Sequence, residues 1–284
     1  MVAVFDVGSN SLILLVTDGQ NDLHDEVRIT RLGEGLDFAG KLTAEAIQRC
    51  MNAVDEFLPL TTGAKILAVG TAALREATNS DQLLAEFAKR GIKLRVLSAE
   101  EEAGLSYASV VDDAAFGPGA TVLDLGGRSL ELADQERRIS LPIGASSVTE
   151  RHLTSDPPAP SELLQACVEI DSRLEPLAQF QPVTRLVLIG GTATTLMAIR
   201  LGAFDIERIH GASITLEEVS EALTTLASMT ADQRLSLPGL DPGRVRAILG
   251  GALFLERAMV KLGVETAQVS VKGLRHAIAR ERGR

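Results

Sequence analysis

The feature that most constrains the fold of this chain is a six-residue pattern that occurs twice, once near the N-terminus and once near the middle. The two copies share the form Asp-x-Gly-x-x-Ser and read Asp6-Val-Gly8-Ser9-Asn10-Ser11 and Asp124-Leu-Gly126-Gly127-Arg128-Ser129. Each follows an apolar run and leads into a second one, as expected for a turn between two buried strands. Because a stacked repeat needs more copies than this, the duplication predicts two similar domains, with a ligand site in the cleft between them.

Short β-rich runs alternate with helical patterns along the chain, which is typical of an α/β protein. Apolar residues at helical spacing predict a helix over Thr43–Leu58. A Ser-x-x-Glu capping box, Ser98 to Glu101, opens another helix. The second half repeats this order of elements, so we expect one domain in residues 1–115 and a second in residues 116–271.

Composition excludes several classes of function. The 284 residues carry a net charge of −10 and have a pI near 5.0, so we expect no nucleic-acid partner and no binding to a membrane surface. The longest aliphatic run near the start, Leu12–Val16, is too short to cross a bilayer. Cys50 and Cys167 lie in helical patterns and are interpreted as buried thiols. The sequence therefore predicts a cytoplasmic protein that binds polyanions only at a local basic site.

Both turns have chemistry that suits phosphate and metal ions. Backbone N–H groups and hydroxyls of such a turn can surround a phosphate, and Asp6 and Asp124 at the strand ends can hold a divalent cation. One such turn alone is more simply explained as a tight hairpin, in which glycine supplies an unusual dihedral angle and Asp or Ser caps the backbone. Two turns in matched positions favour the phosphate-binding interpretation.

Two further segments suit an anion. Gly190-Gly191-Thr192 follows the apolar strand Arg185–Ile189 and precedes a helix, so its amides would point from a helix N-terminus toward a bound anion. Thr71 and Arg75 follow another predicted strand and would add a hydroxyl and a guanidinium. Each has an ordinary alternative, since strand-to-helix turns are common and an isolated arginine is usually solvated.

Attack by water on a bound phosphate would need a general base, and the chain offers two candidate positions. Glu100, Glu101 and Glu102 occupy the first turn of a predicted helix, where the helix dipole alone explains acidic residues. Glu131, on the strand after the second turn, is the other candidate, with a strand-edge charge as its alternative. One carboxylate within reach of a terminal phosphate is sufficient.

These segments, taken in order, resemble the exopolyphosphatase and guanosine pentaphosphate phosphohydrolase (Ppx/GppA) family. The resemblance spans nearly the whole chain and rests on Asp6–Ser11, Gly70–Arg75 with Asn79, Ser98–Ala103, Asp124–Glu131, Leu141–Ala145 with Thr149 and Glu150, Gly190–Thr195, and His210-Gly211. It implies two ribonuclease-H-like domains of the actin, Hsp70 and sugar-kinase superfamily facing an interdomain cleft, with residues 272–284 returning to the first domain. It also implies the short form of the family, without the helical C-terminal extension.

The resemblance assigns roles to the candidate residues. It implies that Glu102 is the base that activates water, that Glu131 is an acid needed for activity, and that Asp6, Asp124 and Glu131 hold Mg²⁺ or another divalent cation. The implied phosphate-binding residues are Ser9, Asn10, Ser11, Thr71, Arg75, Gly126, Gly127, Ser129, Gly191 and Thr192. Arg128 is a further phosphate-binding candidate because of its guanidinium, which the family pattern does not contain. The implied ligands are inorganic polyphosphate and the stringent-response nucleotides guanosine penta- and tetraphosphate. A requirement for K⁺ and a homodimer are left open.

The chain departs from the family pattern at positions that bear on turnover. Arg128 stands where the family usually has a glycine, so its guanidinium either clamps phosphate or occludes the site. Two C-terminal acids of the family pattern are also replaced, at Arg246 and in Val271-Lys272.

The leading hypothesis is a phosphohydrolase that removes the terminal phosphate of polyphosphate or guanosine pentaphosphate by metal-assisted attack of water. The alternative is a polyphosphate- or alarmone-binding sensor with weak or no turnover, and an ATP-dependent kinase or actin-like ATPase is disfavoured. The low aromatic content, with one Tyr, eight Phe and no Trp, favours polyphosphate over a nucleotide.

Overall fold

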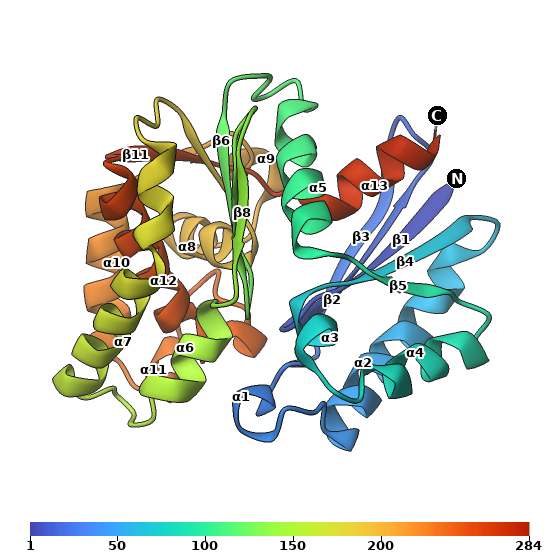
Figure 1. The fold of residues 1–284 in the computed structure, drawn as a ribbon, viewed down its shortest axis with the longest axis horizontal. Coiled ribbons are helices and arrows are strands. Elements are labelled where there is room, and N and C mark those ends of the chain that lie inside the picture. Colours follow the sequence, from blue (N-terminus) through green and yellow to red (C-terminus); the bar gives the residue numbers. More distant parts are fainter. Residues whose placement is uncertain (284) are drawn as a thin grey trace. The chain divides into compact units, whose positions relative to one another are not determined.

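The computed structural model describes residues 1–283, and the chain divides into two compact units (Figure 1). Unit 1 comprises Met1–Leu105 and the C-terminal helix α13 (Leu274–Gly283), and unit 2 comprises Ser106–Gly273. Helix α5 (Ala99–Val111) crosses the division. By its contacts the chain divides inside α5 and at residue 273, because α5 continues unbroken and its second half packs with unit 2. The sequence-based boundaries, after residues 115 and 271, stay a prediction.

Unit 1 is built on a five-stranded mixed sheet with the strand order β3-β2-β1-β4-β5. β1 pairs antiparallel with β2 and parallel with β4. Besides α13 and the first part of α5, its elements are β1 (Val2–Val7), β2 (Ser11–Thr17), β3 (Asp22–Ile29), α1 (Leu36–Ala39), α2 (Ala44–Phe57), η1 (Leu58–Thr61), β4 (Lys65–Gly70), α3 (Ala72–Glu76), α4 (Ser80–Lys89) and β5 (Leu94–Val96).

Helices cover both faces of this sheet, and the strand alternation decides which residue meets which helix. Ala3 and Phe5 of β1 pack in the core that contains α2 and α4, whereas Val2 and Val4 pack in the core that contains α13. Side chains of successive strand residues point to opposite faces, so Asp6 shares the face of Val4. α2 begins as expected, because the Thr43 hydroxyl accepts a hydrogen bond from the backbone of the first helical turn.

Unit 2 repeats this architecture on a six-stranded sheet with the order β10-β11-β9-β6-β7-β8. β6 pairs antiparallel with β7 and parallel with β9, as β1 does with β2 and β4. Its elements are β6 (Thr121–Leu125), β7 (Leu130–Ala133), β8 (Arg138–Leu141), α6 (Ala145–His152), α7 (Pro160–Arg173), η2 (Glu175–Phe180), β9 (Leu186–Ile189), α8 (Gly191–Leu201), α9 (Ile206–Ile209), β10 (Ser213–Thr215), α10 (Leu216–Ser228), α11 (Ala231–Arg234), η3 (Pro242–Arg244), α12 (Ala247–Leu262) and β11 (Thr266–Val269). The two mixed α/β sheets confirm the predicted fold class.

The strand registers show how closely the two units correspond. In unit 1, Asp6 on β1 lies opposite Ile13 on β2. In unit 2, Asp124 on β6 lies opposite Glu131 on β7. Ile13 and Glu131 therefore occupy equivalent register positions in the two units. Unit 2 has an acidic residue at this position, and unit 1 has an apolar one.

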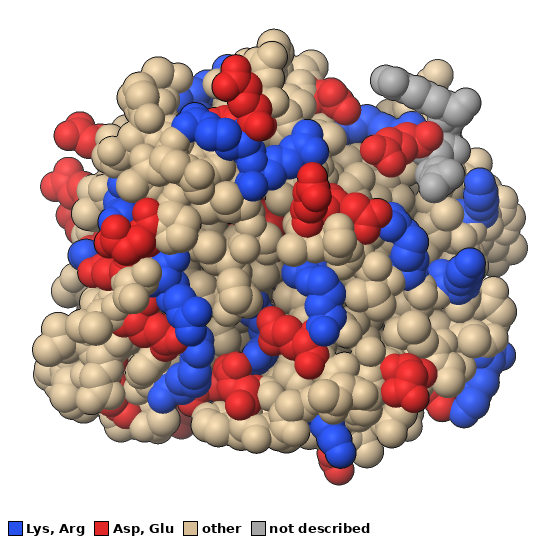
Figure 2. Space-filling model, in the orientation of Figure 1, with Lys and Arg blue, Asp and Glu red and all other residues tan. Residues whose placement is uncertain are grey.

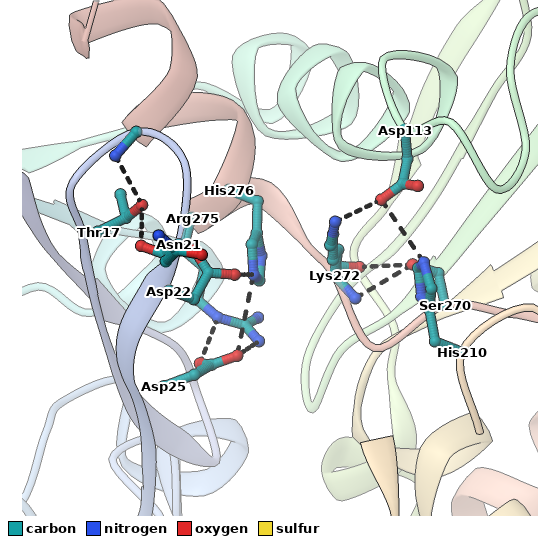
Figure 3. A network of polar contacts seen from close by, with 11 residues as sticks. Thr17, Asn21, Asp22, Asp25, Asp113, His210, Ser270, Lys272, Arg275 and His276 are labelled. Atoms are coloured by element: carbon teal, nitrogen blue, oxygen red, sulfur yellow. Dashed lines mark hydrogen bonds and ion pairs between the residues drawn. The ribbon is translucent and has the colours of Figure 1, made fainter. Parts of the chain in front are cut away.

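Two networks of polar contacts hold the chain on either side of residue 273 (Figure 3). In unit 2, Lys272 Nζ lies 2.7 Å from Asp113 Oδ2, and His210 Nε2 lies 3.5 Å from the same oxygen. In unit 1, Arg275 donates to both carboxylate oxygens of Asp25 at 2.9 and 2.8 Å. The His210-Gly211 motif and Lys272 thus contribute to the internal packing of unit 2.

Three properties of the structure concern the surface and the two thiols. No helix within residues 1–283 is long and apolar enough to cross a membrane. On the face shown in Figure 2, basic and acidic side chains are interspersed. Cys50 is buried, which raises the pKa of its thiol to about 12, whereas Cys167 is only half-buried, which corrects the expectation for that residue.

Candidate active site

The turns Asp6–Ser11 and Asp124–Ser129 are called the first and second phosphate turns, after the role that the sequence predicts for them. The first lies at the carboxyl end of β1, and the segment that follows β3 binds to its backbone. A 2.9 Å hydrogen bond from the Gly8 amide to the Ser11 carbonyl closes the turn. The amides of Thr30 and Arg31 donate to the Asn10 carbonyl at 3.0 and 2.9 Å. These backbone contacts join the turn to the segment that follows β3.

The β4–α3 turn is joined directly to the first phosphate turn. Ser9 Oγ accepts a 3.2 Å hydrogen bond from the Ala73 amide, at the start of α3. The Thr71 amide donates to the Val7 carbonyl at 3.3 Å. Asp6, Ser9 and Thr71 are all buried, so three of the predicted site residues of unit 1 form one packed group at the carboxyl ends of neighbouring strands.

The three consecutive glutamates of α5 differ sharply in environment. Glu102 is buried, and its Oε2 lies 2.5 Å from Arg75 Nη1, which also donates to the Leu97 carbonyl at 3.2 Å. Glu101 is exposed and forms the predicted capping box with Ser98, and Glu100 is also exposed. Only Glu102 is therefore both desolvated and held in one orientation, and Arg75 acts on this carboxylate in addition to its predicted role toward phosphate.

The second phosphate turn, in unit 2, is supported by a helix. The Gly126 amide closes the turn on the Ser129 carbonyl at 2.9 Å. The first amides of α6 donate to the turn carbonyls, Ala145 to Gly126 at 3.0 Å and Ser146 to Gly127 at 2.8 Å. The N-terminus of α6 is thus occupied by the turn itself, which fixes the turn's position on unit 2.

Gly144, the residue before α6, makes this close approach feasible. A Cβ at this position would lie 2.6 Å from the Arg128 nitrogen, the Gly126 oxygen and the Gly127 carbonyl carbon. These are backbone atoms, which cannot rotate away as a side-chain end can. Glycine at 144 is therefore a packing requirement of the second phosphate turn.

Arg128 does not point into solvent, since the residue is only 5% exposed. Ser129, the next residue of the turn, is buried as well. Burial of this guanidinium is compatible with both sequence-based interpretations: Arg128 binds phosphate (a clamp), or it occludes the turn (a plug).

Two carboxylates and a serine form a row across the sheet of unit 2. Asp124, Glu131 and Ser140 are register partners on β6, β7 and β8, so their side chains share one face of the sheet. Ser140 Oγ donates to Glu131 Oε1 at 2.7 Å, and Ser106 Oγ on α5 donates to Asp124 Oδ2 at 2.6 Å. Asp124 and Glu131, both predicted as metal ligands, are therefore neighbours on one face of the sheet.

The third glycine turn lies at the end of β9, beside the second. Gly190 has φ +96°, and a Cβ there would lie 2.7 Å from the Leu125 carbonyl oxygen and 3.1 Å from Asp124 Oδ1. Gly191 is the first residue of α8 and lies in contact with the guanidinium of Arg244. A Cβ on Gly191 would lie only 1.6 Å from Arg244 Nη1. Asp124 and an arginine therefore flank the same turn.

Arg244 is a functional candidate that sequence reasoning did not single out for the site. Burial lowers the pKa of its guanidinium, and the nearby Asp241 carboxylate opposes this shift. Arg244 is half-buried, and a guanidinium at a helix N-terminus is a donor for phosphate oxygens. Sequence reasoning also did not identify Ser106 and Ser140 as site residues. Ser106 could have been found from its position, because it lies one helical turn after Glu102.

The donor set of unit 2 fits Mg²⁺ in one of its usual modes. Within residues 1–283 no group of three or more His, Cys, Asp or Glu side chains could hold a metal ion alone. Mg²⁺ is commonly bound by one or two carboxylates together with substrate phosphates and water. Asp124 and Glu131, on adjacent strands with hard oxygen donors, provide such a pair, whereas Asp6 of unit 1 faces Ile13 and lacks a second acid at that register position.

The fold and these sites define a duplicated α/β protein with glycine turns suited to phosphate in each unit. Residues 12–281 match the model of the Ppx/GppA phosphatase family, and the chain belongs to this family of hydrolases.

Related proteins cover nearly the whole chain. The sequence is 33% identical to a Mycobacterium tuberculosis protein named exopolyphosphatase 2, over 98% of this chain and 97% of that protein. It is 28% identical to the guanosine-5'-triphosphate,3'-diphosphate pyrophosphatase of Aeromonas hydrophila, over 98% of this chain and 58% of that protein. The crystal structure of the Aquifex aeolicus member of the Ppx/GppA family is similar with a TM-score of 0.80 and 26% identity, covering 99% of this chain and 96% of that one. These likenesses support hydrolysis of polyphosphate or a guanosine polyphosphate.

Proposed function

We propose that the protein is an exopolyphosphatase, which hydrolyses the terminal phosphoanhydride bond of inorganic polyphosphate. The observation that carries the proposal is the buried Glu102 carboxylate, which Arg75 orients at 2.5 Å near the carboxyl ends of the strands that bear the first phosphate turn. A positioned carboxylate of this kind can accept the proton of an attacking water.

The other residues bind and orient phosphate groups. The backbone N–H groups of the two matched turns and the start of α8 supply donors, and the Arg244 guanidinium supplies positive charge at the third turn. When bound, Mg²⁺ would neutralise charge on the phosphates, with Asp124 and Glu131 as its protein ligands. Preorganised donors and orientation account for most of the catalytic effect in phosphoryl transfer, so a rigid turn matters as much as the base.

The positions of the aromatic residues support polyphosphate over a nucleotide. Of the eight phenylalanines, Phe5, Phe57, Phe87, Phe116, Phe180 and Phe254 are buried in hydrophobic cores. The two exposed ones, Phe38 and Phe204, lie on α1 and on the α8–α9 connection, outside the three glycine turns. A guanine base would therefore find few rings on which to stack.

Phosphate release measured in parallel from polyphosphate, guanosine pentaphosphate and ATP, each with Mg²⁺, tests the proposal. The expected result is the highest kcat/KM with polyphosphate and negligible release from ATP. A higher kcat/KM with guanosine pentaphosphate would replace the proposed substrate. Tight polyphosphate binding without release from any substrate would support the sensor alternative.

Replacing Arg128 by glycine separates a clamp from a plug. If the guanidinium binds phosphate, Arg128→Gly should weaken polyphosphate binding about tenfold, the equivalent of one charge-assisted hydrogen bond, and make the remaining affinity less sensitive to salt. If it occludes the turn, the variant should release phosphate faster than the wild type. Calorimetry at two salt concentrations and a phosphate-release assay give both answers, and no change in either would contradict both interpretations.

A further inference from the structure

Ser106 contacts Asp124 and has no role in the proposed function. Ser106 is 2% exposed, and its hydroxyl donates to Asp124 Oδ2 at 2.6 Å. The other oxygen, Oδ1, is the one that faces Gly190 in the third turn. Ser106 therefore binds one oxygen of the Asp124 carboxylate, and the other oxygen lies beside the Gly190 turn.

The location of Ser106 on its helix adds to this observation. Ser106 and Glu102 are four residues apart in α5, so their side chains leave the helix on the same side. Tyr107 and Val110 of the same helix pack with Val122 and Ile189 on the sheet face that carries Asp124. The hydroxyl thus fixes the rotation of α5 against β6 at a point one helical turn from the proposed base.

We propose that Ser106 is a positioning residue that orients the Asp124 carboxylate for a divalent cation. The inference rests on the proposed function, in which Asp124 and Glu131 hold Mg²⁺. Groups that hydrogen-bond to a metal-binding carboxylate commonly change metal affinity or activity by about 10–100-fold when they are removed. Ser140 makes the corresponding contact with Glu131, so each acid of the pair has a serine donor.

The test compares Ser106→Ala with Ser109→Ala. Ser109 is a fully buried serine on the same helix, and its hydroxyl donates to the Ser106 carbonyl at 2.7 Å, so its removal is a matched loss of a buried hydroxyl. Mn²⁺ binding to the 284-residue chain is measured by calorimetry, and phosphate release is measured against Mg²⁺ concentration. We expect Ser106→Ala to raise the Mn²⁺ Kd and the KM for Mg²⁺ at least about tenfold, with kcat largely recovered at saturating Mg²⁺.

Two further variants separate positioning from folding. Ser106→Thr keeps the hydroxyl and should recover most of the Mn²⁺ affinity. In an Asp124→Ala background, Ser106→Ala should have little additional effect, because a residue that acts through Asp124 loses its influence when that carboxylate is absent.

The inference is overturned if Ser106→Ala changes Mn²⁺ affinity no more than Ser109→Ala does, or if its effect persists undiminished in the Asp124→Ala background. Failure of the proposed function gives a different result. If the wild type binds Mn²⁺ but releases no phosphate from any substrate, the enzymatic proposal is wrong, while the comparison of Mn²⁺ affinities still decides the role of Ser106. A wild type that binds no Mn²⁺, with or without phosphate, refutes the metal role itself.

Discussion

Glu102→Gln is expected to reduce phosphate release from polyphosphate by a factor of about 10²–10⁴, the usual contribution of a general base. Glutamine has the size of glutamate and can still accept a hydrogen bond from Arg75, so the local packing should survive. It cannot accept the proton of an attacking water. Polyphosphate affinity measured by calorimetry should stay within a few fold of wild type, because the change removes an interaction that matters in the transition state.

Glu100→Gln is the matched control for this prediction. Glu100 lies in the same first turn of α5 and carries the same charge, but it is exposed to solvent. Glu100→Gln changes the net charge and the helix-dipole interaction as much as Glu102→Gln does, but it leaves the proposed base in place. The rate of phosphate release by Glu100→Gln should therefore remain close to that of the wild type. If the two variants lose activity equally, the effect is electrostatic at long range, and Glu102 is not the base.

The fold was predictable because its main signal is local. An aspartate, a glycine and a serine at fixed spacing after an apolar strand describe a tight turn, and the second copy implies a second sheet of the same kind. The strand registers of Asp6 and Asp124 follow from that pattern, since both turns close with the same backbone hydrogen bond. The capping box of Ser98 and Glu101 was equally visible, because its two partners are three residues apart.

Interactions between residues far apart in the sequence were not predictable. Arg75 and Glu102 are joined only because β5 brings the start of α5 beside α3. Arg244 reaches Gly191 from a short 3₁₀ turn that had no strong periodic signal. The division of the two units inside α5 also has no sequence signal, because a continuous helix leaves no composition change where its packing partners change.

Gly144→Ala is expected to have the second large effect, through geometry alone. The added Cβ would lie 2.6 Å from backbone atoms of the second phosphate turn, so either the turn or the start of α6 must move. Overpacking of this kind typically costs about 1–3 kcal/mol of stability. A displacement of about 1 Å in a substrate-positioning element can lower the rate about 100-fold, so we expect a loss in kcat/KM of that order. Thermal unfolding and phosphate release measure the two effects separately.

Ser146→Ala is the control, because it alters the same turn of α6 without adding an atom. The Ser146 hydroxyl is buried and makes no hydrogen bond within the part of the chain that the structure describes, while the amide that binds Gly127 is kept. This variant should retain both stability and activity. Gly144→Ala should lose activity at temperatures well below its unfolding transition, because the damage lies in the position of the turn. If its activity instead falls only in step with the folded fraction, Gly144 serves the stability of unit 2 and the second turn does not need its observed position for catalysis.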